Sequence, residues 1–205
     1  MKLKVCGMKN IHNIAQIASI NPNYMGFIFW EKSTRFINKN TPYLRFDIIK
    51  TGVFVNSSFD YILEKIKIHQ LKAVQLHGGE SEDLCKKLKE LKTVEVIKVF
   101  NIKNNFDFQQ ISSFEKVCDY YLFDTKGKLP GGNGYRFNWD ILRHYPSKKK
   151  FFLSGGIGLS DVSSIIEILK LNLPIYAIDV NSKFELPGGN KDIQKLIKFK
   201  KQLGI

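Results

Sequence analysis

Short apolar runs alternate with amphipathic stretches along the whole chain. The runs are apolar for most of their length, which is typical of strands covered on both faces, and the amphipathic stretches have helical spacing. Regular alternation of strand and helix predicts a parallel sheet. We expect eight strands, at Leu3–Cys6, Tyr24–Trp30, Thr51–Asn56, Ala73–His77, Val94–Phe100, Tyr120–Asp124, Phe151–Ser154 and Ile175–Val180.

Helices are predicted between these strands. Several begin at a side chain that can accept free backbone N–H groups, and these capping residues are Asn10, Ser81, Asp161 and Asn190. A helix is also expected before Phe46 and another after Phe137. The remaining expected helices are Ile11–Ser19, Ser58–Ile68, Ser81–Leu91, Asp161–Leu171 and Lys191–Leu203.

Eight strands spaced by roughly 25 residues favour a closed (β/α)₈ TIM barrel over an open sheet. The chain has 205 residues, which suits one such domain. No low-complexity linker or shift in composition marks a domain boundary, and the short-period repeats of a solenoid are missing. We therefore predict an α/β protein in which residues 1–205 form a single barrel domain.

The composition is ordinary for a globular protein, with 43% hydrophobic and 25% charged residues. No apolar run is long enough to span a membrane, and the first residues do not resemble a signal peptide, so we expect a cytoplasmic location. Cys6, Cys85 and Cys118 are widely spaced and odd in number. They predict neither a disulfide framework nor a metal site.

The charge balance is strongly basic, with 32 basic and 19 acidic residues and a formal charge of +13. Such an excess is also found in nucleic-acid-binding proteins. Here, however, the lysines are spread over nearly every predicted helix rather than gathered in one arm. A positive field also attracts small anionic substrates, and we expect such a substrate rather than nucleic acid or a membrane.

Polar residues stand where many of the predicted strands end. In a parallel barrel the loops that follow the strands meet at one face, and that face carries the active site. One polar residue at a strand end would be a turn or a cap, whereas six at one rim predict a site. They are Cys6, Asn56, His77, Asp124, Ser154 and Asp179, with Phe100 and Trp30 between them.

A glycine-rich loop follows the seventh predicted strand. It reads SGGIG, includes Gly155 and Gly156, and leads toward a helix near Asp161. Glycines allow close approach of an anion, and a helix N-terminus supplies N–H donors. The loop DVNSK, from Asp179, is similarly placed, so the pair predicts a phosphate site; the alternative is two capped turns. Neither loop has the GxxxxGK[ST] or GxGxxG pattern of a nucleotide site.

Seven segments resemble the phosphoribosylanthranilate isomerase family, over essentially the full length of the chain. Their order and spacing make the resemblance specific, because related barrels share the phosphate loops but not the other segments. They are KVCGMKN (4–10), MGFIFWEKSTRFI (25–37), TGVFVN (51–56), AVQLHGGES (73–81), LFDTKGKLPGGNG (122–134), LSGGIG (153–158) and IDVNSKFELPGGNKD (178–192).

The resemblance implies an Amadori rearrangement of N-(5-phosphoribosyl)anthranilate in tryptophan biosynthesis, with no cofactor. It implies that Asp124 is the general acid, that Cys6 is the general base, and that Arg35 pairs with the anthranilate carboxylate. We expect a monomer. The other substrate-binding residues that we expect are His77, Gly155, Gly156, Asp179, Asn181 and Ser182.

Each of these residues also has a structural interpretation. Cys6 would be a small buried hydrophobe, Asp124 an Asx-turn residue, Arg35 a surface ion pair, and His77 a packing residue. Lys183 stands where the family usually has glycine, which leaves the backbone contact with phosphate open.

Other functions remain as alternatives. An indole-glycerol-phosphate synthase would need a catalytic lysine and glutamate at different strand ends, and a sugar-phosphate epimerase would need metal-ligating histidines and aspartates. A basic nucleic-acid-binding protein would need clustered aromatic and basic residues. Neither the synthase pattern nor the epimerase pattern is visible in the sequence.

Lys4 shares the strand face of Cys6, because side chains alternate along a strand. An ammonium beside a thiol favours the thiolate. We hypothesise that Lys4 increases the fraction of Cys6 that can act as a base.

Overall fold

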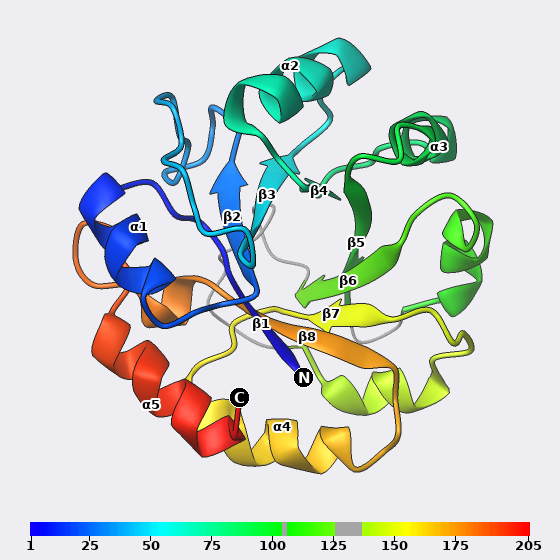
Figure 1. The fold of residues 1–205 in the computed structure, drawn as a ribbon. Coiled ribbons are helices and arrows are strands. Elements are labelled where there is room, and N and C mark those ends of the chain that lie inside the picture. Colours follow the sequence, from blue (N-terminus) through cyan, green and yellow to red (C-terminus); the bar gives the residue numbers. More distant parts are fainter. Residues whose placement is uncertain (104–105, 126–136) are drawn as a thin grey trace.

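Eight parallel strands close into a barrel in sequence order, and β8 pairs back onto β1. The computed structural model describes residues 1–103, 106–125 and 137–205. Helices surround the ring of strands (Figure 1), which confirms the predicted (β/α)₈ barrel. The strands are β1 (Lys2–Val5), β2 (Tyr24–Ile28), β3 (Ile49–Phe54), β4 (Ala73–Leu76), β5 (Glu95–Ile102), β6 (Tyr120–Thr125), β7 (Phe151–Leu153) and β8 (Ile175–Val180).

The five amphipathic stretches given residue ranges above form α-helices within a few residues of their expected bounds. These helices are α1 (Ile11–Ala18), α2 (Phe59–His69), α3 (Glu82–Glu90), α4 (Val162–Leu169) and α5 (Ile193–Leu203). Short 3₁₀ helices are also present among the described residues, namely η1 (Phe108–Phe114), η2 (Trp139–His144), η3 (Leu159–Asp161) and η4 (Ser182–Phe184).

The helix expected after Phe137 is the 3₁₀ helix η2 rather than an α-helix. Its large apolar residues recur at every third position, as Trp139, Leu142 and Tyr145, and all three are buried. A spacing of three fits the three residues per turn of a 3₁₀ helix. The same spacing occurs in η1, where Phe108, Ile111 and Phe114 repeat in the same way.

The helix expected before Phe46 is wrong. Residues 29–48, which connect β2 to β3, are described throughout and contain no helix. Pro42 interrupts this segment, since proline lacks an N–H group and disfavours helical geometry in the residue before it. Leu44 and Ile48 are nevertheless buried, so irregular backbone covers the barrel where the helix was expected.

Two of the four predicted caps, Asn10 and Ser81, accept backbone N–H groups at helix starts. Asp161 stands at the start of α4, but its side chain accepts the N–H of Gly158 instead of one from that helix. The fourth prediction, Asn190, is wrong. The helix α5 begins two residues later, where the Asp192 carboxylate accepts the N–H of Lys195 at 3.0 Å.

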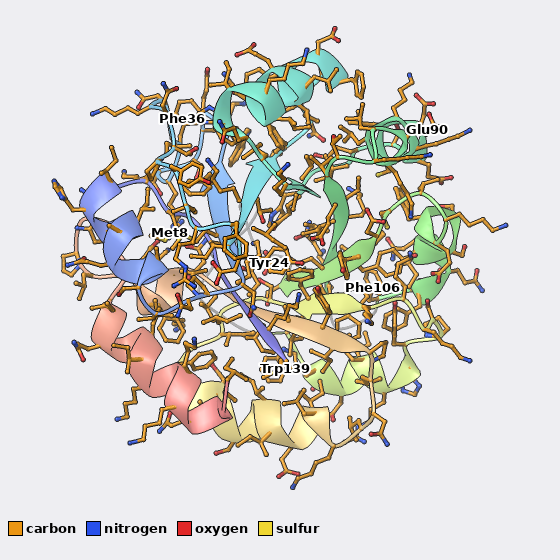
Figure 2. All side chains as sticks on the ribbon, viewed as in Figure 1. Met8, Tyr24, Phe36, Glu90, Phe106 and Trp139 are labelled. Carbon is orange, nitrogen blue, oxygen red and sulfur yellow. The ribbon has the colours of Figure 1, made fainter. Side chains whose placement is uncertain are left out.

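The two faces of the strands bury different clusters. Residues such as Leu3 and Val5 face the helices, in the larger apolar cluster. Tyr24 lies inside the ring of strands (Figure 2), in a smaller cluster with Leu122 and Phe152. Because side chains alternate along a strand, the inward face that carries this cluster also carries the polar residues at the rim. No helix in the described part of the chain combines the length and apolarity needed to cross a membrane.

Candidate active site

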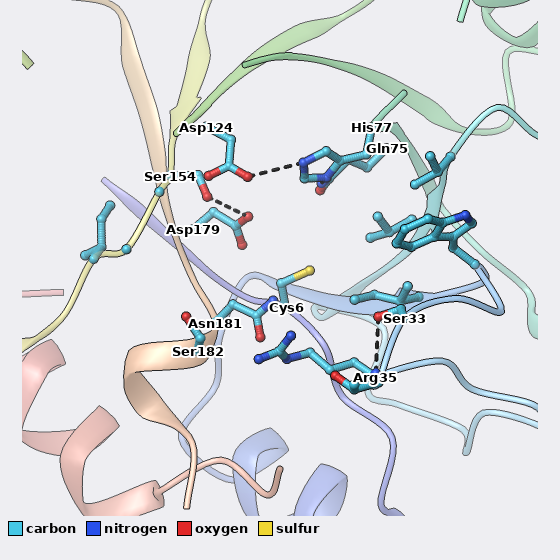
Figure 3. Close-up of a pocket in the computed structure, with 18 of the residues that line it drawn as sticks. Cys6, Ser33, Arg35, Gln75, His77, Asp124, Ser154, Asp179, Asn181 and Ser182 are labelled. Carbon is cyan, nitrogen blue, oxygen red and sulfur yellow. Dashed lines mark hydrogen bonds and ion pairs between the residues drawn. The ribbon is translucent and has the colours of Figure 1, made fainter. Parts of the chain in front are cut away.

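An open cavity lies at the carboxyl ends of the strands. Its volume of about 860 Å³ includes space that is open to solvent. Figure 3 shows polar side chains from several strands and loops pointing into it. The structure brings all nine predicted site residues to its wall, although their chemical roles stay predictions. They are Cys6, Arg35, His77, Asp124, Gly155, Gly156, Asp179, Asn181 and Ser182.

Cys6 directly follows β1, beside Gly26 of β2. A Cβ atom at Gly26 would lie 2.6 Å from the Cys6 Sγ, so glycine makes room for the thiol. Burial raises the pKa of Cys6; the Lys4 ammonium opposes the rise and the Asp179 carboxylate adds to it. The resting group is therefore mainly the neutral thiol at neutral pH.

Lys4 and Asp179 face each other across the seam between β1 and β8. They are register partners, and Lys4 Nζ lies 2.9 Å from Asp179 Oδ1 with both side chains buried. Burial alone lowers the pKa of Lys4, but Asp179 and Cys6 together raise it above its ordinary value. The ammonium acts on Cys6 in the direction that we hypothesised, without overcoming the effect of burial.

Asp124 lies on β6 and is held from two sides. Its Oδ1 accepts the N–H of Thr125 at 2.8 Å, and its Oδ2 lies 3.2 Å from His77 Nε2. The amide nitrogen of Gln75 lies 2.9 Å from His77 Nδ1. When Gln75 donates to Nδ1, the ring proton is on Nε2, which lies near Asp124 without the geometry of a hydrogen bond. His77 is thus an orienting neighbour of the carboxyl group (Figure 3).

Arg35 comes from the segment after β2 and forms a bidentate ion pair. Its Nε and Nη2 donate to Oε1 and Oε2 of Glu185 at 2.7 and 2.6 Å. Hydrogen bonding by Glu185 raises the pKa of Arg35 against the opposing effect of burial. The alternative expectation for Arg35 was an ion pair on the surface. The ion pair is present, but Arg35 lies at the wall of the cavity.

The loop after β7 requires glycine at two positions. Gly155 and Gly156 have φ angles of 95° and 65°, which favour glycine. A Cβ atom at Gly155 would also collide with Oγ1 of Thr125. Among the described hydrogen bonds, none is donated by the backbone N–H groups of Gly155, Gly156 or Ser182. Backbone N–H groups of this kind bind anions in other proteins.

Two residues of the predicted rim do not line this cavity. Asn56 accepts the N–H of Gly79 at 2.8 Å and braces the loop after β4. Phe100 is not the last residue of its strand, because β5 continues to Ile102, and it packs on the outer face against Tyr121. The matched segment LFDTKGKLPGGNG (122–134) lies partly outside the described residues.

Sequence reasoning missed three residues that hold the site together: Gln75, Glu185 and Lys191. All three lie within segments that resemble the isomerase family, at residues 73–81 and 178–192. Neither strand periodicity nor glycine spacing singles out these three residues. Only the resemblance to the family could have indicated them. Within the described ranges, no group of three or more His, Cys, Asp or Glu side chains is arranged to hold a metal ion.

Comparison with known families matches nearly the whole chain. The model for N-(5'-phosphoribosyl)anthranilate (PRA) isomerase matches residues 3–202. A relative from Phocaeicola vulgatus is 40% identical and aligns over 99% of this chain and 98% of its own length. One from Parabacteroides distasonis is 39% identical over 99% and 93%. Both bear the name N-(5'-phosphoribosyl)anthranilate isomerase.

Solved structures of the same kind superpose on the barrel, each covering 100% of this chain and 98% of the other. Phosphoribosyl anthranilate isomerase from Thermotoga maritima has a TM-score of 0.85 at 30% identity. A structure of monomers of the dimeric Thermotoga maritima isomerase has a TM-score of 0.79 at 29% identity. A further isomerase, in complex with reduced 1-(o-carboxyphenylamino)-1-deoxyribulose 5-phosphate, has a TM-score of 0.81 at 28% identity.

Proposed function

Because this chain belongs to the N-(5'-phosphoribosyl)anthranilate isomerase family, we propose that Cys6 and Asp124 are the base and the acid of its reaction. The protein is an isomerase of tryptophan biosynthesis, and it acts on a small phosphorylated substrate. It converts N-(5'-phosphoribosyl)anthranilate into 1-(2-carboxyphenylamino)-1-deoxyribulose 5-phosphate. The observation that carries the assignment is that the thiol and the carboxyl group line one cavity beside the glycines at 155 and 156.

In the first step Asp124 gives its proton to the furanose ring oxygen. The bond between C1 and that oxygen breaks, and the lone pair of the anthranilate nitrogen forms the C=N bond of a Schiff base. His77, 3.2 Å from Asp124 Oδ2, holds the carboxyl group in one orientation. This role needs a group that can change its protonation state near the leaving oxygen, which a carboxyl group provides.

In the second step the Cys6 thiolate removes the proton from C2 of the sugar. The C2–H electrons form a C1=C2 bond, the C=N electrons return to nitrogen, and the enolamine becomes the ketone when C1 gains a proton and the C2 hydroxyl loses one. The Cys6 thiol supplies the proton that C1 gains, and the Asp124 carboxylate takes the proton that the C2 hydroxyl loses. Both groups thus return to their starting state, and the atoms and electrons balance. Asp179 and Lys4 form the charged floor beneath this thiol.

Substrate binding is proposed to use both ends of the cavity. The guanidinium of Arg35 would meet the anthranilate carboxylate, for which a planar fork of donors is suited. The N–H groups of Gly155, Gly156 and Ser182, with Asn181 beside them, would meet the phosphate. Lys183 is exposed and is not among the residues that line the cavity, so this proposal gives it no phosphate contact.

We further propose that the protein is one barrel domain that works as a cytoplasmic monomer, with neither nucleic acid nor a membrane as a partner. The support is that one chain supplies all nine candidate residues of the cavity and that its three cysteines are free thiols. The Thermotoga maritima relative, by contrast, is described as dimeric. Light scattering coupled to size exclusion distinguishes the two states.

The assignment of Cys6 and Asp124 predicts that Cys6→Ser and Asp124→Asn each reduce kcat by about 10²–10⁴-fold, because each removes a proton-transfer group. The loss of phosphoribosylanthranilate is followed by fluorescence. Cys85→Ala is the matched control, since Cys85 is buried and lies outside the cavity, and it should keep the wild-type rate. Undiminished rates in both variants would overturn the roles, and an inactive wild type would contradict the function itself.

A further inference from the structure

Arg35 is held in one position by its neighbours in the protein. Its side chain passes over Gly7, where a Cβ atom would lie 2.7 Å from Arg35 Cδ. Figure 3 shows its guanidinium reaching beneath Cys6 toward Asn181. The Nε and Nη2 groups donate to Glu185. A guanidinium carries five N–H donors, so the edge formed by Nη1 and the second N–H of Nη2 remains for another acceptor.

Glu185 is itself fixed by a second cation. The ammonium of Lys191 lies 2.6 Å from Glu185 Oε1 and 2.6 Å from Asn181 Oδ1, and its side chain is completely buried. Burial alone raises the pKa of Glu185, but the hydrogen bonds from Arg35 and Lys191 lower it below its ordinary value. Glu185 is therefore ionised at neutral pH, and its two oxygens stay acceptors for Arg35.

The charges of this group suit an anionic ligand. Burial lowers the pKa of Lys191, and Glu185 opposes this change. With Arg35 and Lys191 protonated and Glu185 ionised, the three side chains together carry one net positive charge. Glu185 and Lys191 are not among the residues that line the cavity, whereas Arg35 is. An acidic residue so close would weaken an anion site if it stood alone, but Lys191 offsets its charge.

We propose that Glu185 is a positioning residue that holds Arg35 with its free edge toward the carboxylate of the anthranilate ring. The inference rests on the carboxylate-binding role proposed for Arg35. A long side chain loses rotational freedom when it binds a ligand, and binding is tighter when that freedom is already lost. Glu185 thus contributes to affinity for one group of the substrate without touching it.

The test compares two ligands that differ only in the carboxyl group. They are reduced 1-(o-carboxyphenylamino)-1-deoxyribulose 5-phosphate and its phenylamino counterpart, with affinities measured by calorimetry. In the wild type, the ratio of the two affinities gives the contribution of the carboxyl group. We expect Glu185→Gln to reduce that ratio by about tenfold, equal to about 1.4 kcal/mol, and to leave the phenylamino ligand within about twofold. For the substrate itself, KM should rise more than kcat falls.

Two outcomes would overturn the proposal. An equal loss of affinity for both ligands would mean that Glu185 supports the site as a whole, and an unchanged ratio would mean that Arg35 needs no such support. The matched control is Asp47→Asn, which removes the carboxylate from another bidentate arginine pair, Arg45 with Asp47, on the exposed surface. It should leave both affinities unchanged.

Arg35→Met separates this inference from the proposed function. If the ratio of the two affinities is the same in Arg35→Met as in the wild type, the role proposed for Arg35 is wrong. If Arg35→Met brings the ratio close to one and Glu185→Gln leaves it unchanged, only the positioning role of Glu185 is wrong. In the double variant, Glu185→Gln should cause no further loss of the ratio, because a residue that acts only through Arg35 has no effect once Arg35 is gone.

Discussion

The Cys6 thiol lines the cavity beside a buried pair of opposite charges. Lys4 and Asp179 bind each other at 2.9 Å, and they act on the pKa of the thiol in opposite directions. Burial has the largest effect and raises that pKa. Thiolate therefore becomes more abundant as the pH increases, and the rising limb of kcat/KM against pH should follow the ionisation of Cys6.

The opposing effects of Lys4 and Asp179 predict opposite shifts in two variants. Lys4→Met removes the charge that favours thiolate, so the pKa of Cys6 should rise further and the alkylation profile should move about one pH unit upward. Asp179→Asn removes a charge that disfavours thiolate, so the profile should move downward. Rates of iodoacetamide labelling against pH give both results, and an unmoved profile in Lys4→Met would refute the hypothesis.

The rate of alkylation reports on one of the three cysteines. Burial raises the pKa of Cys85 to about 11 and that of Cys118 to about 12. Both side chains are completely buried, whereas Cys6 lines the open cavity. Labelling of the folded protein therefore reports on Cys6, and Cys6→Ser supplies the background rate.

At the scale of single elements, apolar spacing predicted that helices would form but not their type. The repeat of three in Trp139, Leu142 and Tyr145 lies in a 3₁₀ helix, whereas the buried residues Val162, Ile165 and Ile168 have the same spacing in the α-helix α4. The repeat was visible in the sequence. The irregular cover formed by Leu44 and Ile48 was not, because two isolated buried residues have no period.

The start of α5 gives a prediction about capping. Asp192→Ala should lower the free energy of unfolding by about 1 kcal/mol, because its carboxylate no longer accepts the N–H of Lys195. Asn190→Ala is the matched control and should cost much less, since its backbone carbonyl, not its side chain, accepts the N–H of Leu186. Urea unfolding measures both values. Equal losses would mean that the helix is capped differently.

At the scale of the whole molecule, the formal charge of +13 fits the small anionic substrate that we propose for the cavity. A positive field speeds the approach of a negative substrate, and salt screens it. We therefore expect kcat/KM to fall several-fold, roughly threefold to tenfold, when sodium chloride rises from about 20 to about 500 mM. The value of kcat at saturating substrate should change little. A kcat/KM that is independent of salt would show that the charge has no part in substrate capture.

The order of strands along the chain determined the ring, because parallel strands joined by short crossovers can close in sequence order. Alternation along each strand then determined which residues face inward, so Cys6, His77, Asp124 and Asp179 could be placed at one rim from the sequence alone. Resemblance to a known family added Arg35. These features follow from local periodicity and motif order, which the sequence carries directly.

Only the tertiary structure decided the partners of those residues. The pairs Lys4 with Asp179 and Arg35 with Glu185 are 175 and 150 residues apart in the chain, and they meet because the barrel closes between β8 and β1. Burial in that closed ring, rather than residue type, sets the pKa of Cys6. Desolvation and contact across the seam depend on all eight strands together, and no local stretch of sequence encodes them.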